Sequence, residues 1–150
     1  MLSVTPFGKW IATAAITMFS ITNLDGSKDI LGKWKYEEAS IPTVAKAVVN
    51  QIVTRNPGAN KEELEANIGA IEDMVRSIEV DFKDDGTIEL QTPQGPQNLK
   101  YKLIGNAAPY TVEITRPDGT NRKDVILSLT PTKMKYVNVE RGDTAIYIRP

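Results

Sequence analysis

The chain has 150 residues, a formal net charge of −1 at pH 7, and neither histidine nor cysteine. This length fits one domain with a full hydrophobic core, and the near-zero charge provides no global basic field for nucleic acid. Without His and Cys, the sequence excludes Ser-His-Asp and Cys-His catalysis, disulfides and the usual zinc sites. Catalysis by paired carboxylates stays open on composition alone.

The N-terminal segment, residues 1–24, carries one positive charge, Lys9, followed by an apolar run that starts at Trp10. This pattern is typical of a secretory signal and predicts an exported protein, periplasmic or extracellular. The apolar run is too short to span a bilayer. The alternative is an ordinary N-terminal helix. One apolar helical face would be formed by Ile11, Ala14, Ala15, Met18 and Phe19.

The next segment, residues 30–38, predicts a first strand with Trp34 and Tyr36 on its buried face. The apolar period then changes to that of a helix, and residues 41–77 predict two helices separated by Asn56-Pro57-Gly58. Asn60 is the expected N-cap of the second helix.

From Ile78 onward, apolar side chains alternate with a period of two between turns such as Asp84-Asp85-Gly86 and Pro117-Asp118-Gly119. The sequence predicts seven further strands, and because their connections are short, neighbours should be antiparallel. The predicted fold is mostly β: an eight-stranded antiparallel up-and-down barrel with a two-helix hairpin between its first and second strands. An open half-barrel with the helices on its concave face is the rival architecture.

A family resemblance rests on the stretch Leu31-Gly32-Lys33-Trp34-Lys35-Tyr36. It resembles the Gly-x-Trp opening strand of the calycins, and the helical hairpin is similar to the portal lid of fatty-acid-binding proteins. With eight predicted strands, residues 25–150 most resemble bacterial lipocalin-like domains. The resemblance implies that Trp34 closes the narrow end of the barrel under Arg149, with Gly32 as part of the motif.

Two details of the last strand bear on this resemblance. If Ile146 and Ile148 point inward, Arg149 points outward on a regular strand, away from Trp34. Fatty-acid-binding proteins hold the ligand carboxylate with an Arg-x-Tyr pair, whereas this chain has Tyr147-Ile148-Arg149, the reverse order. That carboxylate site is therefore not carried over.

The expected function is non-catalytic binding of a small hydrophobic ligand inside the barrel, with residues 41–77 as a lid. The predicted lining consists of Tyr36, Phe82, Leu90, Tyr101, Leu103, Tyr110, Val112, Leu127, Met134 and Tyr136. A tyrosine offers a ligand both an apolar ring and a hydroxyl group. With equal weight, these residues could simply fill the barrel, because eight strands enclose just enough room for side chains or for one small ligand.

The alternative function is an exported protein-interaction or inhibitor domain with a filled core. Its candidate surface consists of the outward lysines Lys33, Lys35, Lys100, Lys102, Lys133 and Lys135. An enzyme is not expected, because the predicted inward positions hold almost no acids. We expect no cofactor, no metal site, no nucleic-acid partner, no membrane span and a monomer.

Overall fold

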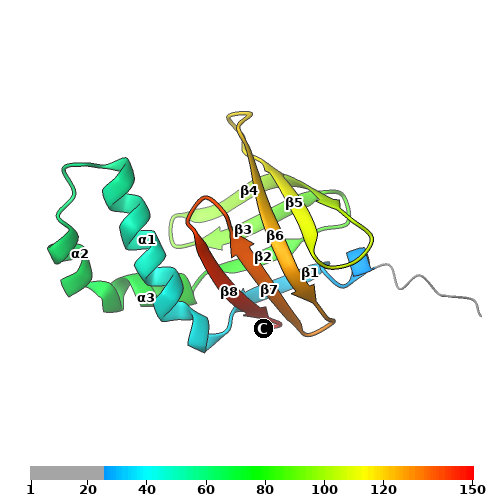
Figure 1. Ribbon diagram of the computed structural model, residues 1–150, viewed down its shortest axis with the longest axis horizontal. Coiled ribbons are helices and arrows are strands. Elements are labelled where there is room, and N and C mark those ends of the chain that lie inside the picture. The colour runs from blue at the N-terminus through cyan, green and yellow to red at the C-terminus, as the bar shows by residue number, and fades with distance from the viewer. Residues whose placement is uncertain (1–25) are drawn as a thin grey trace, which may run out of the picture.

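The structure is a computed structural model that describes residues 26–150 (Figure 1). The predicted export signal, or its alternative as a helix, falls on residues 1–24 and lies outside the described residues. The elements along the chain are β1 (Gly32–Tyr36), the helices α1 (Ile41–Arg55), α2 (Lys61–Ala66) and α3 (Ile68–Arg76), and the strands β2 (Glu79–Phe82), β3 (Thr87–Thr92), β4 (Gly95–Ile104), β5 (Tyr110–Thr115), β6 (Asn121–Leu129), β7 (Lys133–Asn138) and β8 (Asp143–Ile148).

The eight strands form a closed barrel in which each strand pairs with its neighbours in sequence order. The ring closes where β1 pairs antiparallel with β8, in the register Lys35↔Ile148 and Tyr36↔Tyr147. The predicted fold class is confirmed, and the half-barrel rival is wrong. Full closure leaves no strand edge unpaired around the ring, which is the physical gain over an open sheet.

Two hairpin turns use Asp-Gly as the sequence predicts. Gly86 and Gly119 have φ of +82° and +83°, a backbone conformation that residues other than glycine rarely adopt. The preceding aspartates accept hydrogen bonds from backbone N–H groups on the far side of the turn, Asp85 from Thr87 and Asp118 from Thr120. These local contacts determine the geometry of each turn, and the turn geometry determines the register of the two strands that it joins.

One end of the barrel is closed by Trp34, which is fully buried. Its indole N–H donates to Ile30 O at 2.7 Å, and the Arg149 guanidinium carbon lies 3.7 Å from the ring centroid. Arg149 also donates to the carbonyl oxygens of Asp29, Lys33 and Pro131. The arginine therefore ties three backbone segments together over the indole.

The opening glycine of the motif has a steric reason. Gly32 has φ +97°, and a Cβ there would lie 3.1 Å from Arg149 Nη1. A larger residue would strain the backbone and crowd the guanidinium.

The condition under which Arg149 would point away from Trp34 is not met in β8. Ala145 and Tyr147 are buried, whereas Ile146 and Ile148 are only partly buried. Arg149 follows Tyr147 by two positions and so lies on the same, inner side. Because residues two positions apart share a face of a strand, Arg149 reaches Trp34 without any break in β8.

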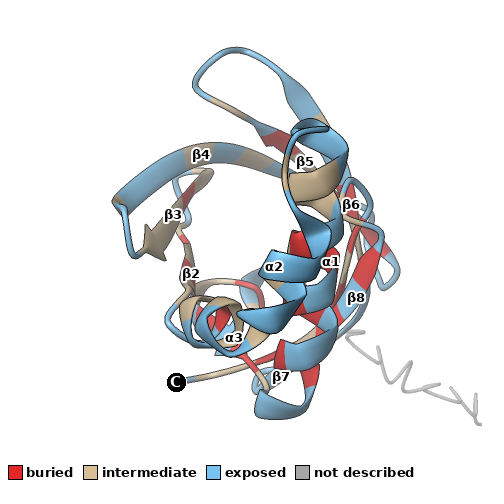
Figure 2. Ribbon diagram, turned by 90° about the vertical axis from the view of Figure 1, so that its left-hand side faces the viewer, coloured by how far each residue is buried: buried red, intermediate tan, exposed pale blue. Residues whose placement is uncertain are grey.

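The helical insertion lies at the opposite end from Trp34, against β1 and β8 (Figures 1 and 2). Its apolar residues Ile41, Val44, Ala45 and Val75 belong to the same buried cluster as the barrel core. Helix α1 ends at Arg55, directly before Asn56-Pro57-Gly58, where the sequence predicts the break between the helices. Among residues 26–150, none of the helices has the length and apolarity needed to cross a membrane.

The second predicted helix is two helices in the structure. Asn60 caps α2 as expected, because its side chain accepts from the backbone N–H groups of Glu62 and Glu63. Asn67 then leaves the helical conformation, with φ −102° and ψ 21°. Its side chain donates to Glu63 O at 2.9 Å, so it satisfies a terminal carbonyl of α2 before α3 begins.

A buried serine completes the barrel seam where β1 gives way to the helices. Glu37 N–H still donates to Ile146 O at 2.8 Å, but the chain then turns into a 3₁₀ turn, Glu38–Ser40. The next donor on β8, Ile146 N–H, donates instead to Ser40 Oγ at 2.8 Å. The hydroxyl thus replaces the carbonyl that a longer β1 would have supplied.

Replacing Ser40 with alanine should lower the free energy of unfolding by about 1–3 kcal/mol, because a partly buried N–H of β8 loses its acceptor. Urea unfolding followed by circular dichroism would measure the change. Ser128→Ala, on the exposed face of β6, is the matched control and should stay within about 0.5 kcal/mol. Equal midpoints for the two variants would contradict this role of Ser40.

Candidate functional site

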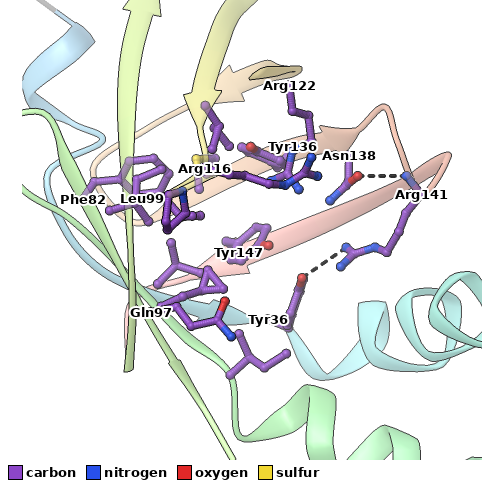
Figure 3. A pocket seen from close by; sticks show the side chains of 17 residues that line it. Tyr36, Phe82, Gln97, Leu99, Arg116, Arg122, Tyr136, Asn138, Arg141 and Tyr147 are labelled. Atoms are coloured by element: carbon purple, nitrogen blue, oxygen red, sulfur yellow. Dashed lines mark hydrogen bonds between the residues drawn. The ribbon is translucent and has the colours of Figure 1, made fainter. Parts of the chain in front are cut away.

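The helical end of the barrel contains a cavity of about 260 Å³ (Figure 3). Most of its wall is apolar: Ile78, Val80, Phe82, Ile88, Leu90, Leu99, Ile114, Pro117 and Met134. The remaining wall is aromatic or polar: Tyr36, Gln97, Arg116, Arg122, Tyr136, Asn138, Arg141 and Tyr147. No residue of α1, α2 or α3 belongs to the wall, so the helices flank the cavity without lining it.

The structure brings only half of the predicted lining together around this cavity. The residues that reach it are Tyr36, Phe82, Leu90, Met134 and Tyr136. The others, with the exception of Leu127, pack in the rest of the barrel. Tyr110 and Val112 are buried in the core cluster, and Leu103 packs against it. Tyr101 sets its ring edge-on to Phe82, at 5.1 Å between centroids, and donates to Lys83 O at 2.9 Å.

The barrel is therefore filled at one end and hollow at the other. Around Trp34, side chains occupy the interior, as the packed-core alternative expects. Toward the helices, the interior widens into the cavity. Protein interiors are normally close-packed with few voids larger than a water molecule, so a space of this size is a distinct structural feature.

The prediction that Leu127 faces the interior is wrong. Leu127 is 43% exposed, whereas Ile126 and Asp124 are fully buried. The strand offers three consecutive apolar residues, Val125 to Leu127, so alternation alone cannot choose between its faces. A register shift between Ile126 and Ser128 then returns Leu129 toward the core.

Sequence reasoning consequently missed two inward polar residues, Arg122 and Asp124. The turn at Asp118-Gly119 could have revealed them. A hairpin that closes at this turn pairs Tyr110 with Ile126 and Val112 with Asp124, as the structure has it. Directly paired residues share a face, so inward Tyr110 and Val112 require inward Ile126 and Asp124.

Asp124 organises a buried polar cluster behind the cavity wall. Its carboxylate accepts from Tyr136 Oη at 2.7 Å and from Val139 N–H at 3.1 Å. Arg122 Nε lies 2.9 Å from Asp124 Oδ2, forming an ion pair. Burial, together with the nearby Asp124 carboxylate, raises the pKa of Tyr136 well above its ordinary value. Tyr136 is thus a neutral hydrogen-bond donor whose hydroxyl is already engaged.

A second ion pair supports the tyrosine side of the cavity. Arg141 donates two hydrogen bonds to Asp143, from Nε to Oδ1 at 2.6 Å and from Nη2 to Oδ2 at 3.1 Å. Its Nη2 also donates to Tyr36 Oη at 3.2 Å. The ring centroids of Tyr36 and Tyr147 lie 4.4 Å apart. Burial raises the pKa of Tyr147 well above its ordinary value, so the Tyr147 hydroxyl is neutral at pH 7.

Glu140, in the turn between β7 and β8, connects the cavity wall to the helices. It accepts hydrogen bonds from Arg116 on the cavity wall and from Arg55 at the end of α1. Partial burial pushes the pKa of Glu140 up, but the hydrogen bond from Arg116 and the charges of Arg116, Arg55 and Arg122 outweigh it and hold the pKa below its usual value. Glu140 is therefore an anion at neutral pH.

The predicted lysine surface is divided: Lys35 and Lys133 both lie opposite Ile148 across β8, whereas Lys100 and Lys102 lie apart from them. Strand β4, which carries Lys100 and Lys102, is separated from β1 by β2 and β3 and from β7 by β5 and β6. Lys33 pairs with Glu79 and Lys133 with Glu37, each at 2.8 Å. These pairs neutralise two of the six positions and leave no positive face that spans the three strands.

No family model matches the chain, and no curated protein matches it significantly. The architecture is compatible with a calycin-like fold through its closed eight-stranded meander and its helical first connection.

Proposed function

We propose that this protein binds one small, largely apolar molecule in the barrel cavity and does not act on it chemically. The observation that carries the proposal is the cavity of about 260 Å³ with a mainly apolar wall. An apolar cavity of about 150 Å³ already holds benzene, and ligand sites usually begin near about 300 Å³. The space therefore suits a compact ligand.

The arrangement of acids supports binding without catalysis. Asp124 and Asp143 are buried behind the wall. Asp124 is held by Arg122, by the Tyr136 hydroxyl and by Val139 N–H, and Asp143 is held by two hydrogen bonds from Arg141. Among residues 26–150, no carboxylate lines the cavity. A general acid or base must reach the reacting atoms directly or through one water molecule, and neither Asp124 nor Asp143 lines the ligand space.

We further propose that the chain is an exported member of the calycins. The Arg149–Trp34 stack at the closed end and the helical insertion after β1 support the family. Export rests on the charge and the apolar run of residues 1–24.

Filling the cavity should abolish binding. Leu99→Trp adds an indole to a wall residue, so we expect the affinity for a compact neutral fluorescent probe, naphthalene, to fall by about tenfold or more. Leu127→Trp adds the same group to the exposed face of β6 and should leave probe affinity unchanged. Fluorescence titration measures both variants.

Native mass spectrometry of protein purified from its own cells complements this titration. A bound mass that leaves on solvent extraction would identify the ligand. A clean apo mass, together with no uptake of the probe by the wild-type protein, would overturn the proposal and favour the protein-interaction alternative.

A further inference from the structure

We propose that the ligand is an amphiphile with one compact anionic group, which Arg122 binds at the helical end of the barrel, and a short apolar tail that points toward Phe82 and Met134. This inference rests on the proposed function and specifies the class of ligand. It starts from the charge of the cavity wall. Among residues 26–150, the charged side chains of the wall are Arg116, Arg122 and Arg141.

The three arginines share one end of the cavity. Arg116 follows β5, Arg122 lies at the start of β6, and Arg141 lies between β7 and β8, all at the helical end of the strands. Figure 3 shows this polar group with Asn138 on one side of the cavity and Phe82 and Leu99 on the other. The wall is thus polarised, cationic at the helical end and apolar toward Trp34.

The arginines differ in how fully they are engaged. Arg141 is held by Asp143 and Tyr36, and Arg116 by Glu140. Arg122 has weaker contacts. Its Nε lies 2.9 Å from Asp124 Oδ2 but is buried without a hydrogen-bond partner in the described part of the chain. Its Nη1 is 3.8 Å from Glu140 Oε2, beyond hydrogen-bonding distance.

Arg122 therefore presents unused donors to the cavity. A guanidinium group carries five N–H donors and no acceptor, in a planar fork that matches carboxylate, sulfate or phosphate oxygens. Asn138 adds an amide donor, because its Oδ1 accepts from Arg141 N–H and leaves the NH₂ group available. In a partly desolvated cavity, such donors favour an anion over a neutral or cationic group.

The volume limits the tail. In proportion to the cavity of about 150 Å³ that holds benzene, about 260 Å³ accommodates about ten non-hydrogen atoms. Beyond the cavity the interior is filled by core residues such as Tyr110 and Val112. A chain of eight carbons fits this space, whereas a long fatty-acid chain would have to project past the helices. Arg149 plays no part, because it is committed to Trp34 at the closed end.

The test compares ligands that differ only in the head group. Isothermal titration with octanoate, octanamide and octylamine measures the charge preference, and octyl sulfate and octyl phosphate distinguish the anions. We expect the wild-type protein to bind at least one of the three anions about tenfold more tightly than octanamide, as a hydrogen bond to a charged group implies. Hexadecanoate should bind no more tightly than octanoate.

The variants assign the effect to Arg122. Arg122→Gln should remove the preference for the anion, measured as the ratio of the anion affinity to the octanamide affinity of the same variant. A cooperative urea transition followed by circular dichroism shows independently that the variant folds. Arg55→Gln is the matched control, because Arg55 shares Glu140 but lies on α1 outside the cavity wall. It should keep the full preference.

The outcomes separate the two proposals. If octanamide binds as tightly as every anion, or if Arg122→Gln retains the preference, the head-group inference is overturned and the proposed function stands. If no member of the panel binds the wild-type protein but the neutral probe does, the head-group inference alone fails. If neither the panel nor the probe binds, both proposals fail.

Discussion

Replacing Trp34 with alanine should destabilise the protein by about 3–5 kcal/mol, the usual loss for a fully buried aromatic side chain. The indole is 0% exposed and lies under the Arg149 guanidinium, which itself binds three backbone carbonyl groups. Its removal creates a cavity and also leaves the buried Ile30 carbonyl without its donor. The closed end of the barrel therefore loses packing and hydrogen bonding in one step.

Urea unfolding of the wild-type and variant proteins measures this loss. Trp34→Phe keeps an aromatic ring but removes the N–H donor, so it should fall between wild type and alanine. Val139→Ala, at a 56% exposed position, is the control and should change stability by less than about 0.5 kcal/mol. A loss below about 1 kcal/mol for Trp34→Ala would mean that the closed end contributes little to stability.

Asp124→Ala should have a comparable effect, about 3–5 kcal/mol, for an electrostatic reason. The carboxylate is 0% exposed and is the acceptor for Tyr136 Oη and Val139 N–H and the ion partner of Arg122. Its removal leaves a cation and two donors facing a buried space. Breaking a buried pair from one side costs more than the pair contributes, because the remaining charge is uncompensated.

Thermal and urea unfolding would measure this second effect. Asp124→Asn keeps one acceptor oxygen and should lose less than alanine does. Asp84→Ala, in the exposed turn after β2, is the matched control and should be nearly neutral. Full stability in Asp124→Ala would show that water reaches this cluster and solvates Arg122.

The topology could be predicted because its determinants are local. Asp-Gly turns, short connections and alternating apolar residues each act within a few positions of the chain. They predict the meander, and the meander with one apolar face has to close on itself. The helical insertion was predictable for the same reason, apart from the break at Asn67, where an asparagine side chain competes for a backbone carbonyl.

Strand faces were less predictable where both faces are apolar. In β8, Ile146 and Ile148 read as inward residues, but α1 packs beside this strand, so its outer face is also apolar. In β6, Val125 to Leu127 gave alternation no clear preference. The register set by the neighbouring hairpin, and not the pattern within the strand, places Asp124 and Arg122 inside.

The sequence by itself determined the strand order, the closed end at Trp34 and five of the seventeen residues of the cavity wall. Only the tertiary structure decided that the helical end is hollow and that Arg122 faces the cavity. The physical reason is that an unfilled volume depends on the summed shapes of side chains from strands far apart in sequence. Likewise, a charged group inside the barrel is stable only beside partners that the fold brings to it. Arg122 lies beside Asp124 of the same strand and near Glu140 of the turn after β7, and Asp124 in turn accepts a hydrogen bond from Tyr136 of β7.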